Sequence, residues 1–152
     1  MSASIQPHSG SRLLPSIEKA TVADAMHPGV MSCEPRAPAV TVARMMATHR
    51  IHAVVVDGVH VDAVHGEQEQ VIWGLVSDLD LARAAYAGAD ALTASDLAAT
   101  EPVTIEPSVP LAEAAKIMDE HGTAHLIVVD RGRPVGVIST LDVAAALAWG
   151  RG

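Results

Sequence analysis

Several residue types that define common protein classes are scarce in this chain. There is one cysteine, Cys33, so no disulfide can form within the chain, and a lone cysteine in an apolar stretch is typical of a buried small hydrophobe. Aromatic residues make up 2% of the sequence and phenylalanine is missing, so aliphatic side chains must fill the interior. No apolar run approaches the roughly 20 residues of a membrane span, and the N-terminus lacks the apolar core of a secretion signal. We therefore expect a soluble, cytoplasmic protein without membrane association.

Positive charge is scarce as well. Ten Lys and Arg residues stand against 18 Asp and Glu residues, which leaves a net charge of -8. Such a surface repels a phosphate backbone, so nucleic acid is not an expected partner. Apolar residues are abundant instead: 49% of the 152 residues are hydrophobic, enough for one compact domain or two intimately packed half-domains.

An internal repeat runs through most of the sequence at a spacing of 72 residues, which becomes 73 after a one-residue slip before the segment at 51–57. The matching segments are TVADAM (21–26) with TASDLA (93–98), APAVTVARMMATH (37–49) with VPLAEAAKIMDEH (109–121), IHAVVVD (51–57) with AHLIVVD (124–130), and GLVSDLD (74–80) with GVISTLD (136–142). The last pair is offset by 62, because the first copy carries about eleven extra residues. We expect a flexible segment over 1–15, a first repeat over 16–87 with an insertion at 58–70, and a second repeat over 88–150.

The same local elements are predicted in each copy. An apolar stripe at helical spacing indicates an amphipathic helix. Continuous β-branched runs, at 54–56 and 127–129, are each followed by turn residues and a second apolar run, which predicts strand pairs covered on both faces. A serine or threonine then precedes a final helix, over 78–87 and 140–149.

These elements predict the fold class. Each unit reads strand, helix, strand, strand, helix, preceded by a short helical turn. A three-stranded sheet with two helices on one face leaves its other face apolar and uncovered, so one copy alone would be marginally stable. We therefore expect an α/β (α+β) fold in which two β-α-β-β-α repeats pack sheet to sheet with pseudo-twofold symmetry. The insertion reads as a lengthened hairpin connection that reaches into solvent.

The paired GLVSDLD and GVISTLD segments, each at the same place in a repeated unit, resemble a tandem pair of CBS domains, the cystathionine-beta-synthase type module also called a Bateman module. The resemblance covers the chain from about Ser16 to Trp149. It implies binding of an adenosine-containing ligand, such as AMP, ADP, ATP or S-adenosylmethionine, in clefts between the repeats. It also implies regulation of a partner protein, which the sequence does not identify.

The Ser-x-x-Asp junctions suit such a ligand. A strand that runs into a helix aims backbone N–H groups and a hydroxyl at one spot, where anions bind. A carboxylate three residues on can accept both hydroxyls of a ribose. We therefore expect Asp80 and Asp142 to bind ribose, and phosphate to be bound by Ser77, Ser139 and Thr140. The alternative is that these side chains only cap their helices.

The family arrangement implies that each cleft takes its aspartate from one repeat and its strand-entry residues from the other. The implied sets are Asp142 with Arg50 and His52, and Asp80 with Thr123 and His125. Arg50 is the strongest phosphate clamp among them, because guanidinium binds phosphate oxygens bidentately; a solvated arginine at a helix end is the alternative. The first strands would supply an apolar adenine slot from Met31, Cys33, Val103 and Ile105.

One departure separates the two clefts. Asp78 follows Ser77, where its carboxylate would repel a phosphate, so the Asp80 cleft suits an adenosine ligand with fewer charges or stays empty. The Asp142 cleft is the better candidate. The insertion, with its histidines, lies over or beside a cleft in this interpretation.

Metal binding and catalysis are not expected. His49 with His52, and His121 with His125, have the spacing of metal ligands on a helix, but the second member of each pair falls at a strand entry. No pairing of a nucleophile with a base and no Gly-rich phosphate loop accompanies the aspartates, so the chain does not read as an enzyme.

We expect the chain to act as a stand-alone module that senses an adenosine-containing ligand. A ligand that touches both repeats favours their closed arrangement and so changes packing or assembly. Alanine-rich final helices allow close contact with a second copy, as in the disc-like dimers of the family, so we expect a homodimer. The alternative is a ligand-free structural or dimerisation module.

Overall fold

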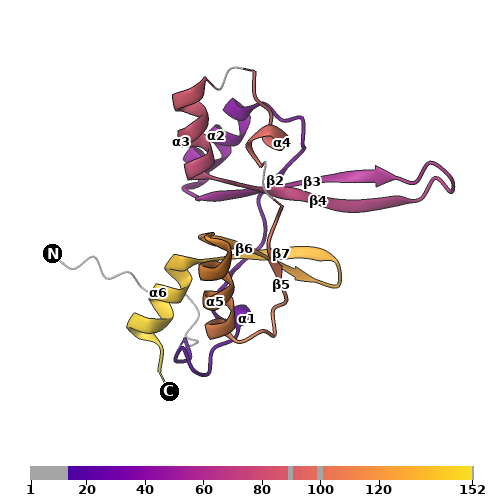
Figure 1. Ribbon diagram of the computed structural model, residues 1–152. Helices are drawn as coiled ribbons and strands as arrows, with labels where there is room; N and C mark the ends of the chain where they lie inside the picture. The colour runs from indigo at the N-terminus through magenta and orange to yellow at the C-terminus, as the bar shows by residue number, and fades with distance from the viewer. Residues whose placement is uncertain (1–13, 89–90, 99–100, 152) are drawn as a thin grey trace.

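The computed structural model describes residues 14–88, 91–98 and 101–151, so the expected flexible segment over 1–15 lies outside the described residues except for its last two. Those two residues are paired with the other end of the chain. The Arg151 N–H donates to the Leu14 carbonyl at 3.0 Å, and the Ser16 N–H donates to the Arg151 carbonyl at 3.1 Å. The two ends of the described chain therefore lie side by side (Figure 1).

The elements alternate as the repeat predicts. In the first repeat they are α1 (Val22–Ala25), β1 (His27–Pro28), β2 (Ser32–Cys33), α2 (Ala39–His49), β3 (Ala53–Val61), β4 (Gln68–Ser77) and α3 (Asp78–Ala87). In the second they are α4 (Ala94–Leu97), β5 (Thr104–Ile105), α5 (Leu111–His121), β6 (His125–Asp130), β7 (Arg133–Ser139) and α6 (Thr140–Trp149). Both long first helices, α2 and α5, begin after a proline and end at a residue in the left-handed conformation.

Two sheets face each other, with the longer helices on their outer sides (Figure 1). Their strand orders are β2-β3-β4 and β1-β7-β6-β5. Side chains alternate between the faces of a strand, so the members of a buried run point in opposite directions. Val55 and Ile127 have no exposed surface, yet they belong to neither helix-side core. They fill the layer between the sheets, which confirms the predicted sheet-to-sheet packing.

The two short helices are exchanged between the repeats. Val22 of α1 lies in the core formed by α5, α6 and the second sheet, and Ala94 of α4 lies in the core of the first sheet. Equivalent backbone bonds hold both in place: the Val22 N–H donates to the Val109 carbonyl at 2.8 Å, and the Ala94 N–H donates to the Ala37 carbonyl at 2.8 Å. Strand β1 also crosses over, because it pairs with β7. Each half of the molecule is therefore built from both repeats.

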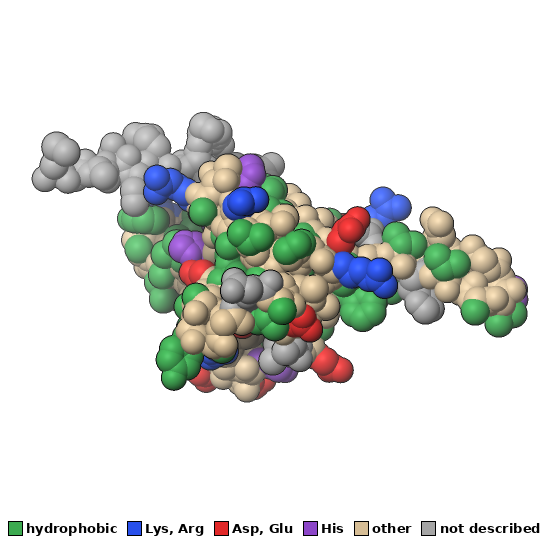
Figure 2. Space-filling model, turned by 90° about the horizontal axis from the view of Figure 1, so that it is seen from above, with side chains coloured by type: hydrophobic (Ala, Val, Ile, Leu, Met, Phe, Trp, Pro, Cys, Tyr) green, Lys and Arg blue, Asp and Glu red, His purple; other side chains and the backbone are tan. Residues whose placement is uncertain are grey.

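The insertion at 58–70 is paired as strand over most of its length. Strands β3 and β4 continue their register from Gly58 opposite Val71 to Val61 opposite Gln68. Valines on alternate residues suit an extended ribbon, so the hairpin connection is itself built of paired strands on both sides of its turn. We call residues 58–71 the arm; it projects beyond the rest of the molecule, with hydrophobic side chains on its surface (Figure 2).

No helix among the described residues is long and apolar enough to cross a membrane.

Candidate functional site

The first strand-to-helix junction is closed by a capping box. Asp80 Oδ2 accepts from the Ser77 N–H at 2.8 Å and from the Ser77 hydroxyl at 3.0 Å, while the Asp80 N–H donates to Ser77 Oγ at 3.3 Å. The other oxygen, Oδ1, lies 4.0 Å from the guanidinium of Arg83, whose side chain is 72% exposed. An exposed pair at that distance holds the oxygen weakly. Capping thus uses one oxygen of Asp80 and leaves the second available.

The second junction has the same capping box, and here a histidine also binds the second oxygen of the aspartate. Asp142 Oδ2 accepts from the Ser139 N–H at 2.7 Å and from the Ser139 hydroxyl at 3.1 Å. Its Oδ1 lies 3.0 Å from Nδ1 of His27, and 6% of the Asp142 side chain is exposed, against 27% for Asp80. The neighbouring carboxylate raises the pKa of His27. Of the two aspartates, the one we expected to be the better site is the more enclosed.

Histidine and carboxylate groups of both repeats meet near His125. Its imidazole is half-buried, and burial lowers its pKa, while the charges of Asp78 and Asp80 from the first repeat and of Asp142 from the second act to raise it. His52 Nδ1 lies 2.8 Å from Asp78 Oδ2, and this bond lowers the pKa of Asp78. The structure therefore brings His125 near both predicted aspartates, and it pairs His52 with the carboxylate that we expected to repel phosphate.

The remaining strand-entry residues lie at the same end of the sheets. The Thr123 hydroxyl donates to the His125 carbonyl at 3.0 Å and so orders the start of β6. The Thr140 N–H donates to the Ala124 carbonyl at 3.0 Å, which ties the start of α6 to the start of β6. Arg50 is exposed and ends α2 with a φ of 52°.

The residues expected to form the adenine slot divide between two environments. Cys33 packs against the first helix-side core and Ile105 belongs to the second. Met31 and Val103 lie just before these strands, and their carbonyls accept from β3 and β6 at 3.0 Å. The faces that point between the sheets at β2 and β5 carry Ser32 and Thr104 instead, because these residues pair with Val55 and Ile127. Ser32 and Thr104 are exposed, so at these strands the inter-sheet face is open and polar, and the four apolar residues do not form the expected slot there.

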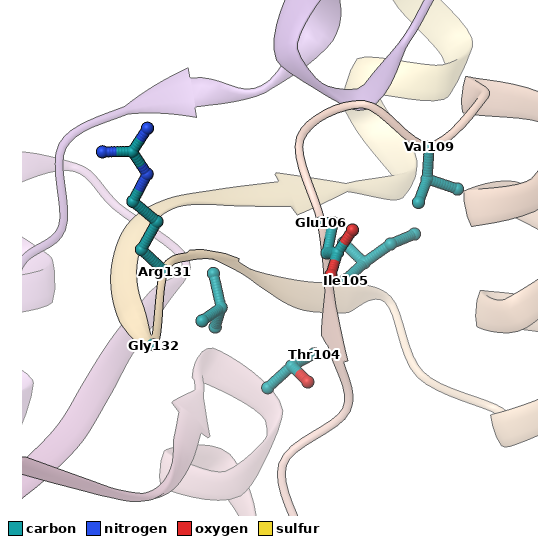
Figure 3. Close-up of a pocket in the computed structure, with 7 residues that line it drawn as sticks. Thr104, Ile105, Glu106, Val109, Arg131 and Gly132 are labelled. Carbon is teal, nitrogen blue, oxygen red and sulfur yellow. The ribbon is translucent and has the colours of Figure 1, made fainter.

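Two open hollows lie at the opposite end of β6, on either side of the β6–β7 turn. The first measures about 460 Å³ and is lined by Thr104, Ile105, Glu106, Val109, Val129, Arg131 and Gly132. The second measures about 470 Å³ and lies between that turn and the arm. Figure 3 shows the Arg131 side chain directed away from Glu106. Of the predicted ligand-binding residues, Ile105 alone is among the lining residues of these two hollows.

His27 is the site residue that the sequence does not reveal. It reads as an exposed polar residue, and 64% of its side chain is indeed exposed. Its position follows from β1, where His27 pairs with Val137, and Val137 also pairs with Ile127 of the inter-sheet layer. Directly cross-strand residues share a face, so His27 lies on the inter-sheet face beside the start of α6. Only the crossing of β1 to the second sheet creates this contact.

Among the described residues, no group of three or more His, Cys, Asp or Glu side chains is placed to hold a metal ion.

Comparisons with known proteins agree with the repeated fold. L-aspartate semialdehyde sulfurtransferase of Methanocaldococcus jannaschii is 41% identical over 54 residues, which are 35% of this chain and 11% of that enzyme. The chain thus spans about a tenth of the length of that relative. The CBS domain-containing protein YhcV of Bacillus subtilis (strain 168) is 28% identical over 126 residues, covering 82% of this chain and 83% of that protein.

A solved structure has the same architecture. The CBS domain pair of protein MJ0100, in complex with 5′-methylthioadenosine and S-adenosyl-L-methionine, has a TM-score of 0.70 at 19% identity, covering 85% of this chain and 96% of that chain. The family whose sequence pattern matches is described as CBS domain, and it matches twice, at residues 22–87 and 94–148. The resemblance read from the two Ser/Thr-x-x-Asp segments is therefore confirmed, and the chain belongs to the CBS-domain family, with two copies of the domain in tandem.

Proposed function

We propose that this CBS pair binds an adenosine-containing ligand between its repeats, with Asp80 and Asp142 as the two ribose-binding carboxylates. The observation that carries the proposal is the equivalent placing of the two aspartates: each repeat ends a strand at a serine whose N–H and hydroxyl both donate to Oδ2 of the aspartate three residues on. Each aspartate caps its helix with Oδ2, so a ribose hydroxyl would donate to Oδ1, which is open at Asp80 and is bound by His27 at Asp142. The complex of MJ0100 with two adenosyl compounds supports this class of ligand.

The charge of the site favours ligands with few phosphates. Asp78 lies beside the Asp80 junction, and its bond to His52 engages the imidazole that would otherwise face a phosphate. With three carboxylates around His125, each added phosphate increases like-charge repulsion. We expect 5′-methylthioadenosine and S-adenosylmethionine to bind more tightly than AMP, and AMP more tightly than ATP.

The response to ligand is a change in packing between the repeats. A ligand that contacts groups of both repeats binds their closed arrangement more tightly than an open one, and this difference in affinity shifts the population. We infer a regulatory rather than a catalytic role, in which a partner protein recognises the closed arrangement. The activity of the sulfurtransferase is not transferred to this chain, because the match covers 54 residues of it.

Thermal unfolding tests the proposal. The melting temperature is measured with 5′-methylthioadenosine, S-adenosylmethionine, AMP, ATP and, as a control, GMP at equal concentrations. A ligand that binds only the folded state raises the midpoint by mass action, so the adenosyl compounds should raise it in the order given and GMP should not. The shift should shrink in Asp80→Asn and disappear in the double variant with Asp142→Asn. If none of the adenosyl compounds raises the midpoint, the proposal is wrong.

Self-association is a second candidate function, favoured by the outer helices. Leu79 and Tyr86 of α3, and Leu141, Leu147 and Trp149 of α6, are each at least 55% exposed. Exposed apolar groups on outer helices are typical of an interface with another molecule, and we propose a homodimer through α3 and α6. Light scattering should return twice the 15.7 kDa chain mass at micromolar concentration, and Leu141→Asp with Leu147→Asp should reduce it to one. A monomeric parent protein would overturn the homodimer.

A further inference from the structure

Both oxygens of the Asp142 carboxylate already accept donors, and little of the side chain is open to a ligand. Both Ser139 donors use Oδ2, at 2.7 and 3.1 Å. Nδ1 of His27 takes Oδ1 at 3.0 Å, and 6% of the side chain remains exposed. Because the imidazole covers Oδ1 of this nearly buried carboxylate, a ribose hydroxyl has to take the place of the imidazole to reach that oxygen.

The first repeat has no equivalent bond among the described residues. Asp80 Oδ1 faces Arg83, 4.0 Å away on the next turn of the same helix, and the Arg83 side chain is 72% exposed. A flexible exposed arginine is displaced at little cost. His27, in contrast, is held by β1, whose two residues pair with Val137 and Gly136 of β7. The pseudo-twofold symmetry of the fold is thus broken at the two carboxylates.

We propose that His27 is a gate on the Asp142 site: its imidazole and the ribose of an adenosyl ligand compete for the same carboxylate oxygen. The proposal rests on the proposed function, because it assumes that Asp142 can bind ribose. The two sites are consequently unequal. The Asp80 site fills first, and the Asp142 site fills only when the His27 bond opens.

Protonation sets the strength of the gate. A protonated imidazole bound to a carboxylate is a charge-assisted pair, and the neutral ring makes a weaker bond. Asp142 of α6 faces the imidazole directly, and His125 of β6 interacts with the charge of Asp142. Asp78, Asp80 and His52 act on His125 in turn. The residues opposite β1 on β7, Gly136 and Val137, carry no charge. Because Asp142 raises the pKa of His27, the gate stays protonated above the ordinary histidine range and weakens as the pH rises through that raised pKa.

The test measures ligand binding at each site separately, in variants that keep only one of the two aspartates. Asp80→Asn leaves the Asp142 site, and Asp142→Asn leaves the Asp80 site. Binding of 5′-methylthioadenosine, which carries no phosphate, is measured by calorimetry from about pH 6 to about pH 9. In the Asp80→Asn protein the affinity should rise by about tenfold or more over this range, the factor that one pKa unit represents. Adding His27→Ala should give tight binding at every pH. Adding His27→Gln keeps a hydrogen-bond donor without a charge, so binding should be weaker than with His27→Ala and should not change with pH.

A matched control and two contrary results keep the gate falsifiable. His65 and Asp62 form a similar pair at 2.9 Å on the arm, so His65→Ala in the Asp80→Asn protein should leave the pH dependence unchanged. If Asp80→Asn binds equally with and without His27, the gate is wrong and the proposed function stands. If Asp80→Asn does not bind even without His27 while Asp142→Asn binds, the gate is wrong and adenosine binding is confined to the Asp80 site. If neither single-site protein binds, the proposed function is wrong and the gate fails with it.

Discussion

At the scale of single residues, two histidines of the site respond to acid in opposite directions. Asp142 raises the pKa of His27, so its contribution to stability is fully present below the unfolded value of 6.5 and is lost as the pH rises through the folded pKa. Burial lowers the pKa of His125, so the folded state resists its protonation and loses stability as the pH falls below 6.5.

Urea unfolding as a function of pH separates these two effects. His125→Gln should remove part of the stability loss between about pH 6.5 and about pH 5. His27→Gln should do the reverse and lower stability most on the acid side, where the parent protein gains from the charged pair. His52→Gln is a useful comparison. The hydrogen bond from His52 lowers the pKa of Asp78, so the stability that this bond contributes is lost only at lower pH, where the Asp78 carboxylate becomes protonated. Identical pH profiles for all three variants would contradict this assignment.

Arg50 and Arg131 share an unfavourable backbone conformation, with φ of 52° at both. The second repeat has Gly122 where the first has Arg50 at the end of the corresponding helix. Left-handed geometry is costly for a residue with a Cβ, so Arg50→Gly and Arg131→Gly should each stabilise the fold by about 0.5 kcal/mol. If Arg50 clamps phosphate, Arg50→Gly alone should weaken AMP binding while leaving 5′-methylthioadenosine binding unchanged. Equal loss of both ligands would argue against that role.

At the scale of elements, the exchanged short helices make a distant part of the chain necessary for each core. Val22 of α1 has no exposed surface and lies in the core of the second repeat. Val22→Ala should therefore destabilise the protein by about 2 kcal/mol, because a buried methyl pair is lost. Val64→Ala on the arm, where 82% of the residue is exposed, is the matched control and should change stability little. Denaturant midpoints of the two variants provide the comparison, and similar midpoints would overturn the exchange.

Most elements could be predicted from the sequence, because buried runs such as Val54–Val56 and the apolar helix stripes are local patterns. The exchange of α1 and α4 could not, since a short capped helix carries no signal of which sheet it packs on. The same limit applies to the site. The two aspartates are visible in the repeated segments, whereas His27 reaches Asp142 only through the crossing of β1. Strand alternation also could not orient Cys33 and Ile105, because their strands are two residues long and show no repeating pattern.

At the scale of the whole molecule, the exchange should make unfolding a single transition. Each helix-side core contains a short helix of the other repeat, and the buried layer of Val55 and Ile127 joins the two sheets, so opening one half exposes apolar surface of the other. We expect calorimetric and van't Hoff enthalpies of unfolding to agree, and fragments 16–87 and 88–150 to remain unfolded when they are expressed separately. Two resolved transitions in the intact chain, or a folded fragment, would show that the repeats are independent.

The adjacency of the two ends has a practical consequence for protein engineering. Because Leu14 and Arg151 are joined by a backbone hydrogen bond, a short peptide can close the chain there, and new termini can be opened at the tip of the arm beside Val64. Such a circular permutant keeps every strand pair of both sheets, and it moves the start of translation onto a slender ribbon that stands clear of both carboxylate junctions.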